Sequence, residues 1–215
     1  SENVFSGLTP SILAIVSNSI AVSYYGLASM IGGVLYSLGV VLRKVFMAEV
    51  GRVLESDNPR SRFQFLMERV GSLQLCVIGL VFVGFVSLGE SFICLWNSPD
   101  GVPVLYPCII LLMVPSILRM VQDIGTTGLI VQGNNRPIAF VNVAMALIST
   151  LVLVVFAPTY GALAAGFAVF CGGVFRVIAL QFVFRRNLGV DSLHFASRTF
   201  GRWVLPAAAI CGIFY

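Results

Sequence analysis

The stretch from residue 104 to residue 132 is almost wholly apolar in its first half and carries two charged residues, Arg119 and Asp123, about halfway along. A helix of this length extends about 40 Å at a rise of roughly 1.5 Å per residue. The hydrocarbon core of a bilayer is about 30 Å thick, so such a helix is long enough to cross it. The stretch therefore predicts a transmembrane helix with charged residues inside the membrane.

Arg119 and Asp123 are four residues apart and share one face of that helix with Gln122 and Thr126. A charged side chain that faces lipid at mid-depth is strongly unfavourable. We therefore expect Arg119 and Asp123 to pair and the polar face to line an internal cavity. Two alternatives stay open here: the pair only neutralises itself and helps two helices dock, or the limits of the span are drawn wrongly.

The composition extends this interpretation to the whole chain. Apolar residues make up 58% of the sequence and charged residues only 10%, whereas soluble domains carry about 25% charged residues. The sequence predicts an all-α, polytopic transmembrane helix bundle that forms a single lobe over residues 1–215. It has about five full spans and partial helices at both ends. The full spans are residues 20–42, 70–89, 104–132, 138–156 and 162–184, and the partial helices lie in 1–17 and 203–215.

Several functional classes are not expected from this sequence. The basic residues flank apolar spans, so nucleic acid is not an expected partner. The five cysteines lie within or at the ends of apolar segments and the single histidine stands alone, so neither a disulfide framework nor a metal site is expected. Neither a glycine-rich phosphate loop nor the spacing of a catalytic triad is found, and we expect no cofactor and no enzyme activity.

Small residues recur every fourth position in two of the spans. Ser29, Gly33 and Ser37 do so in the first span, a pattern that lets another helix approach closely. In the last span, Ala164, Ala168 and Gly172 are followed at the same interval by Arg176. Because small residues mark the face that meets other helices, we expect Arg176 to point into the bundle. The alternative is that its long side chain reaches back to the membrane surface.

The basic residues predict the orientation in the membrane. Every Lys and Arg except Arg119 and Arg176 lies in one of three stretches, 43–69, 133–137 and 185–202. The turns near 97–103 and 157–161 contain none. By the positive-inside rule, the three basic stretches are cytoplasmic and the two turns lie on the outer side. We expect a multi-pass protein of the plasma membrane, the inner membrane of a bacterium.

Five stretches, in this order, resemble a known family. They are IAVSYYGLASMIGGVL, RKVFMAEVGRVLESDN, ESFICLWNSPDGVPVLYPCIILL, IVQGNNRPIAFVNVAMALIS and APTYGALAAGFAV. Together they are similar to the O-antigen-type polysaccharide-biosynthesis flippases of the multidrug/oligosaccharidyl-lipid/polysaccharide exporter superfamily. Members of that family have about twelve to fourteen helices in two lobes. The resemblance implies that this chain is the C-terminal lobe, and that a missing N-terminal lobe or a second subunit is its partner.

The resemblance also implies a function. The family moves a polyprenyl-pyrophosphate-linked oligosaccharide from the inner to the outer leaflet, for the synthesis of surface polysaccharides such as O-antigen and lipopolysaccharide. We expect Arg119 and Arg176 to attract the anionic headgroup of this cargo within the lipid bilayer. Asp123 would orient Arg119 or couple transport to a proton or cation. Gln122 and Thr126 would complete the cavity wall.

Two other functions are compatible with the same sequence. A multidrug or small-cation antiporter of the same superfamily would favour acidic groups in its cavity, whereas here two arginines accompany one aspartate at membrane depth. The second alternative is an inactive, truncated membrane fragment. The chain starts with Ser and ends inside an apolar run, and we expect it to be cut at both ends.

Overall fold

The computed structural model describes residues 9–15, 19–55, 58–97 and 99–188. The long helices are α2 (Ser19–Leu54), α3 (Pro59–Trp96), α4 (Val102–Val121), α5 (Asp123–Val131), α6 (Arg136–Tyr160) and α7 (Ala162–Leu188). A short 3₁₀ turn, η1 (Pro99–Gly101), precedes α4, and residues 9–15 are also helical. The described part of the chain is almost entirely helical and contains no strand, as predicted.

Five helical segments of the described chain are long and apolar enough to cross a membrane, and each overlaps one of the five predicted spans. The chain is therefore a multi-pass membrane protein. The predicted cytoplasmic stretch 185–202 is described only as far as Leu188, and the predicted partial helix at 203–215 lies outside the described residues. Of the predicted partial helix at 1–17, residues 9–15 are described and helical.

The basic stretch 43–69 is mostly helical. α2 continues past the first predicted span to Leu54, and α3 starts at Pro59, directly after Asn58. Proline suits the first turn of a helix because its missing N–H would have no partner there. With 36 and 38 residues, α2 and α3 are each about 55 Å long, well beyond the thickness of a hydrocarbon core. Both helices therefore extend past the membrane.

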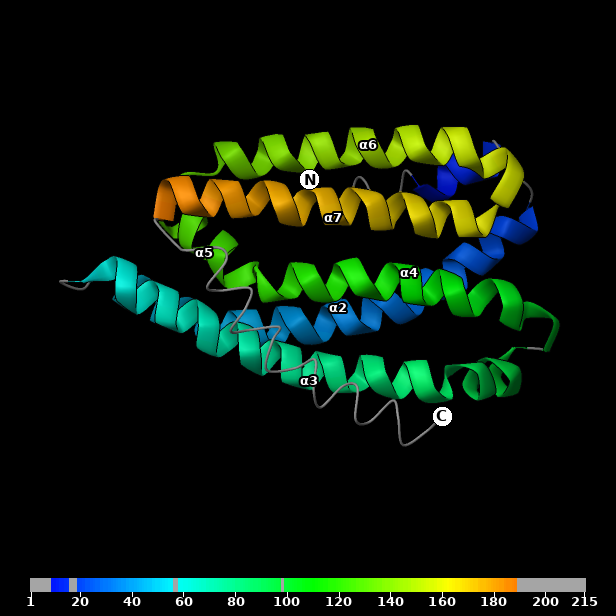
Figure 1. The fold of residues 1–215 in the computed structure, drawn as a ribbon, viewed down its shortest axis with the longest axis horizontal. Helices are drawn as coiled ribbons and strands as arrows, with labels where there is room; N and C mark the ends of the chain where they lie inside the picture. The colour runs from blue at the N-terminus through cyan, green and yellow to red at the C-terminus, as the bar shows by residue number, and fades with distance from the viewer. Residues whose placement is uncertain (1–8, 16–18, 56–57, 98, 189–215) are drawn as a thin grey trace.

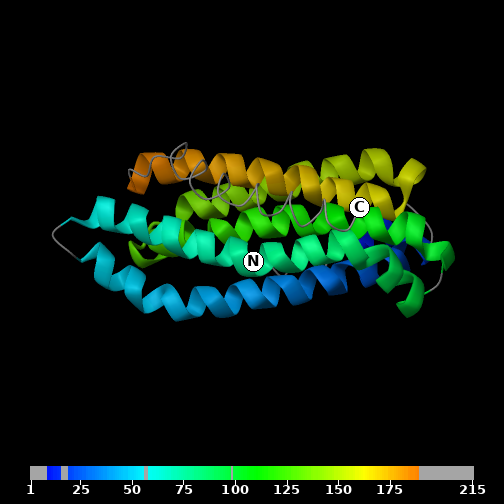
Figure 2. The same ribbon diagram turned by 60° about the horizontal axis from the view of Figure 1, so that its bottom comes forward.

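The helices lie side by side along the long axis of the molecule (Figures 1 and 2). α4 is central, since it packs against α7 on one side and against α2 and α3 on the other, while α6 packs on the outer side of α7. Short connections join neighbours. Gly133 and Gly161 have positive φ angles of 74° and 54° at the turns before and after α6, a conformation that glycine adopts without strain.

Glycines bring α7 and α5 close to their neighbours. A Cβ atom added at Gly173 would overlap the ring of Pro115 on α4. A Cβ at Gly125 would lie 2.8 Å from the ring of Phe184. Small residues at such crossings let backbones approach and increase van der Waals contact, which is the main attraction between helices in lipid.

The stripe Ser29, Gly33 and Ser37 was expected to meet another helix. In the structure all three residues are exposed, and a Cβ at Gly33 would meet nothing within 4 Å. The opposite side of α2 is the packed one, with Ala28 and Leu35 buried. The stripe therefore faces away from the described bundle.

The prediction of a single helix over residues 104–132 is wrong in one respect. α4 ends at Val121 and α5 starts at Asp123, and α5 leaves the axis of α4 at this joint (Figure 1). At Gln122 the backbone N–H bonds to the carbonyl of Arg119 at 3.0 Å, three residues back instead of four. This tighter bond ends the α-helical ladder there.

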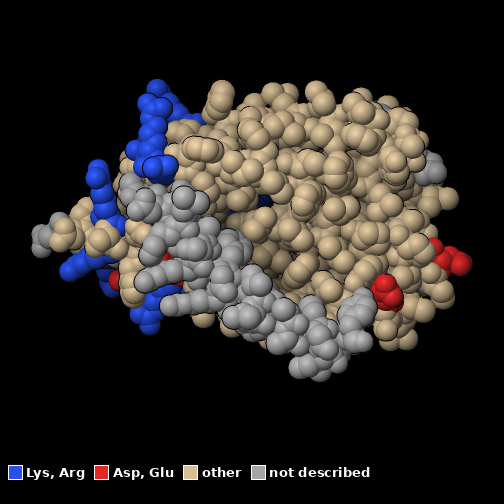
Figure 3. Space-filling model, viewed as in Figure 1, with Lys and Arg blue, Asp and Glu red and all other residues tan. Residues whose placement is uncertain are grey.

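Basic side chains on the visible face gather at one end of the molecule. In Figure 3, Lys and Arg gather at the end that holds the tips of α2 and α3, with a few acidic side chains among them, whereas the opposite end of the visible face shows Asp and Glu alone. The basic end corresponds to the predicted cytoplasmic side. The plasma-membrane location and the sidedness remain predictions.

Candidate functional site

A group of polar side chains lies around the α4–α5 joint, and we call it the polar layer. It consists of the predicted residues Arg119, Gln122, Asp123, Thr126 and Arg176 with four further residues, Tyr36, Arg43, Gln74 and Asn142. Gln122, Asp123 and Arg176 are only 2%, 2% and 3% exposed. Thr126 is also buried. These polar groups therefore lie inside a membrane helix bundle, the most unfavourable place for them unless they have partners or a function.

Asp123 forms an ion pair with Arg43 of α2. The guanidinium Nη1 of Arg43 lies 3.9 Å from Oδ2 of Asp123. Arg43 was assigned to the cytoplasmic basic stretch and was not among the predicted site residues. α2 and α4 run parallel, as the neighbouring pairs Gly39 with Met120 and Gly32 with Leu112 show, and this register brings Arg43 to the start of α5.

Arg119 is half-buried and faces α2 as well. Its Nη2 donates a hydrogen bond to the hydroxyl of Tyr36 at 3.2 Å. The guanidinium carbon also lies 4.9 Å from the centre of the Tyr36 ring, within the range of a cation–π interaction. Tyr36 thus contacts Arg119 both through its hydroxyl group and through the face of its ring.

Gln122 and Thr126 hold the joint between α4 and α5. The Gln122 side chain donates to the carbonyl of Val177 on α7 at 3.0 Å. The hydroxyl of Thr126 donates to the carbonyl of Gln122 at 3.3 Å. Both contacts give a side-chain donor a partner at a depth where the membrane interior offers no water.

Arg176 projects from α7 toward α6, where its Nε donates to Oδ1 of Asn142 at 3.0 Å. Ala164, Ala168 and Gly172 of the same stripe are buried too. The inward direction of Arg176, inferred from the four-residue period of small residues, is confirmed. Its predicted role in binding cargo is a separate matter.

Gln74 on α3 is 0% exposed, and neither atom of its amide has a hydrogen-bond partner among the described residues. Phe63 lies beside Gly128, and Val86 accepts a hydrogen bond from Tyr106. This antiparallel register of α3 on α4 and α5 places Gln74 near the level of Ile117. Gln74 therefore lies at the same depth in the bundle as the polar layer.

The two arginines of the layer contact different helices. Arg119 bonds to α2, and Arg176 bonds to α6 on the far side of α7. Two cavities of the described bundle, one of about 1060 Å³ between α2 and α3 and one of about 420 Å³ between α4, α6 and α7, are lined by none of the predicted site residues. A cavity shared by Arg119 and Arg176 stays a prediction.

Within the described residues, no group of three or more His, Cys, Asp or Glu side chains could hold a metal ion. The cysteines in this part of the chain, Cys76, Cys94, Cys108 and Cys171, are free thiols. Comparison with protein-family models, with curated proteins and with solved structures finds no match to this chain.

Four residues of the layer were not predicted as site residues. Gln74 and Asn142 are each a lone amide within an otherwise apolar span, and that isolation was the available signal. Tyr36 and Arg43 lie near the inner end of the first span, where aromatic and basic residues are ordinary. Only their packing against α4 and α5 distinguishes them.

Proposed function

We propose that this chain forms a lobe of a membrane transporter that flips a polyprenyl-pyrophosphate-linked oligosaccharide across the bacterial plasma membrane. The burial of Arg176 is the observation that carries the proposal. A guanidinium kept at membrane depth and only 3% exposed is strongly unfavourable unless it serves a function. Arginine is also well suited to phosphate, because its planar fork makes paired, charge-assisted hydrogen bonds.

The joint at Gln122 supports a transport function over a purely structural one. Discontinuous membrane helices are typical of transporters, where the interrupted segment lies beside the substrate. In this chain the joint coincides with the polar layer, and Gln122 and Asp123 lie at its centre. Movement of α5 relative to α4 would expose Arg119 and the Arg43–Asp123 pair to a headgroup.

The proposal includes the arrangement in the membrane and the partner. The lipid part of the cargo stays in the bilayer while its sugar-pyrophosphate headgroup passes between two lobes. The second lobe is a further part of the same protein or a second subunit. The basic stretches 43–69, 133–137 and 185–202 face the cytoplasm in this scheme. The family resemblance of the sequence and the buried cations support it.

The test is complementation of a strain that lacks the gene, with surface polysaccharide and the amount of protein in the membrane measured together. We expect Arg176→Ala and Arg119→Ala to abolish surface polysaccharide at normal protein levels. Arg176→Lys should retain part of the activity, because it keeps the charge and loses the fork. Arg186→Ala, at an exposed position near the end of the same helix, is the matched control. Normal polysaccharide in Arg176→Ala would refute the proposed role.

A second candidate is export of cationic drugs or small cations, and the burial of Asp123 favours it. A carboxylate that is 2% exposed at membrane depth suits coupling to a proton or cation. For this function, Asp123→Asn should increase the sensitivity of cells to cationic drugs while surface polysaccharide stays normal. For a flippase, drug sensitivity should not change.

A further inference from the structure

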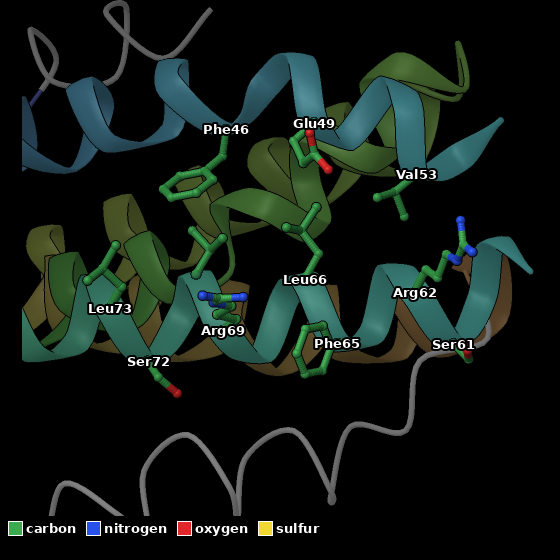
Figure 4. A pocket seen from close by; sticks show the side chains of 11 residues that line it. Phe46, Glu49, Val53, Ser61, Arg62, Phe65, Leu66, Arg69, Ser72 and Leu73 are labelled. Carbon is green, nitrogen blue, oxygen red and sulfur yellow. The ribbon is translucent and has the colours of Figure 1, made fainter. Parts of the chain in front are cut away.

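A groove lies between the basic-end halves of α2 and α3, apart from the polar layer. Its volume is about 1060 Å³. Figure 4 shows Phe46 and Glu49 of α2 pointing toward α3, and Arg62 of α3 pointing toward the end of α2. Arg69, Leu66 and Leu73 also line it. The groove therefore combines two guanidinium groups with a row of apolar side chains.

The groove carries a net positive charge. Arg62 and Arg69 are both exposed, and no carboxylate among the described residues pairs with either of them. Glu49 is the one acidic residue of the lining, and it lies 3.6 Å from Arg52, which does not line the groove. An anion in the groove would therefore meet two free guanidinium groups.

The groove changes from charged to apolar along α3. Residues 70–89 contain no charged side chain, so Arg69 marks the edge of the membrane span. Arg62 lies about 10 Å further out along the helix, whereas Leu73 lies one turn further in and is 45% exposed. The water-facing part of the groove is thus cationic, and the membrane-facing part of the groove is apolar.

We propose that this groove binds an anionic phospholipid of the adjacent leaflet. The lipid phosphate lies between Arg62 and Arg69, and the first part of an acyl chain packs on Leu66, Leu73 and Phe46. Phosphate recognition by guanidinium is charge-assisted, and basic residues near a membrane surface attract anionic lipids. A zwitterionic phospholipid carries no net charge and binds less tightly. This site does not depend on the transport proposal.

The binding test uses the purified full chain in a neutral detergent, titrated with dioctanoyl phosphatidylglycerol or dioctanoyl phosphatidylcholine, with bound lipids counted by native mass spectrometry. Arg62→Ala and Arg69→Ala should each weaken phosphatidylglycerol binding about fivefold, given about 1 kcal/mol for each basic residue near a membrane surface. Arg60→Ala removes another exposed arginine of the same helix, one that does not line the groove. It should leave binding unchanged.

Two further experiments test the contributions of the acyl chain and of the phosphate to lipid binding. Leu73→Gln should weaken phosphatidylglycerol binding while both arginines remain, and inorganic phosphate at millimolar concentration should fail to displace the lipid. The proposal is overturned if Arg60→Ala weakens binding as much as Arg62→Ala, or if the two lipids bind equally. Displacement by inorganic phosphate would also overturn it, because the groove would then be a simple anion site.

Discussion

Arg43 on α2 and Asp123, the first residue of α5, form an ion pair across the bundle, with 3.9 Å between Nη1 and Oδ2. The carboxylate end is 3% exposed and the arginine side chain 29% exposed, so one partner is inside the protein and the other reaches toward its surface. A negative side chain is also favourable at the start of a helix, where the backbone N–H groups point outward. The pair therefore ties the tip of α5 to α2.

Replacing Arg43 should destabilise the bundle, because it leaves the buried carboxylate of Asp123 without this cation. We expect Arg43→Ala to lower the free energy of unfolding by roughly 1–3 kcal/mol, measured as thermal unfolding in detergent. Lys44→Ala removes the neighbouring exposed cation and should have little effect. The double variant Arg43→Ala with Asp123→Asn should be more stable than Arg43→Ala alone. Equal stability of the two would contradict the pairing.

The crossing of α4 and α7 should be sensitive to a single methyl group at Gly173. A Cβ there would overlap Pro115, whose ring cannot rotate away. We expect Gly173→Ala to lower the free energy of unfolding by about 1–3 kcal/mol, observed as a lower melting temperature in detergent.

Gly84→Ala on α3 is the matched control for Gly173→Ala. A Cβ at Gly84 would meet nothing within 4 Å, and alanine favours a helix over glycine by up to about 1 kcal/mol. This variant should be neutral or slightly stabilised. A Gly173→Ala protein as stable as the Gly84→Ala protein would mean that α4 and α7 are not packed as the structure has them.

The orientation in the membrane can be tested with single cysteines. In a chain whose own cysteines are replaced by alanine, Arg60→Cys and Asp100→Cys both introduce exposed thiols, at opposite ends of α3 and its following turn. If the basic end is cytoplasmic, a membrane-impermeant maleimide should label the thiol at position 100 in intact spheroplasts. The thiol at position 60 should react only after permeabilisation. The reverse pattern would invert the predicted topology.

The helices and the direction of Arg176 could be predicted from the sequence because both depend on local periodicity. Apolar runs of sufficient length define the spans, and small residues at every fourth position define the packed face of α7. The break at Gln122 has no such signal, since neither glycine nor proline lies directly beside it. The pairing of Asp123 with Arg43 depends on the parallel packing of α2 against α4 and α5, and the local sequence does not contain that information.

Replacing Gln74 should separate the stability of the protein from its function more clearly than replacing any other residue of the polar layer. Its amide is 0% exposed and has no hydrogen-bond partner among the described residues. A buried, unsatisfied polar group of this kind costs about 1–3 kcal/mol, and replacing it by an apolar group of similar size removes that penalty. We therefore expect Gln74→Leu to raise the melting temperature in detergent. If the Gln74 amide is needed for transport, the stabilised Gln74→Leu variant should also fail in the complementation assay. Gln64→Leu, at a half-buried position of the same helix, is the control and should complement normally. An unchanged or lowered melting temperature would show that the Gln74 amide has partners that stabilise the fold.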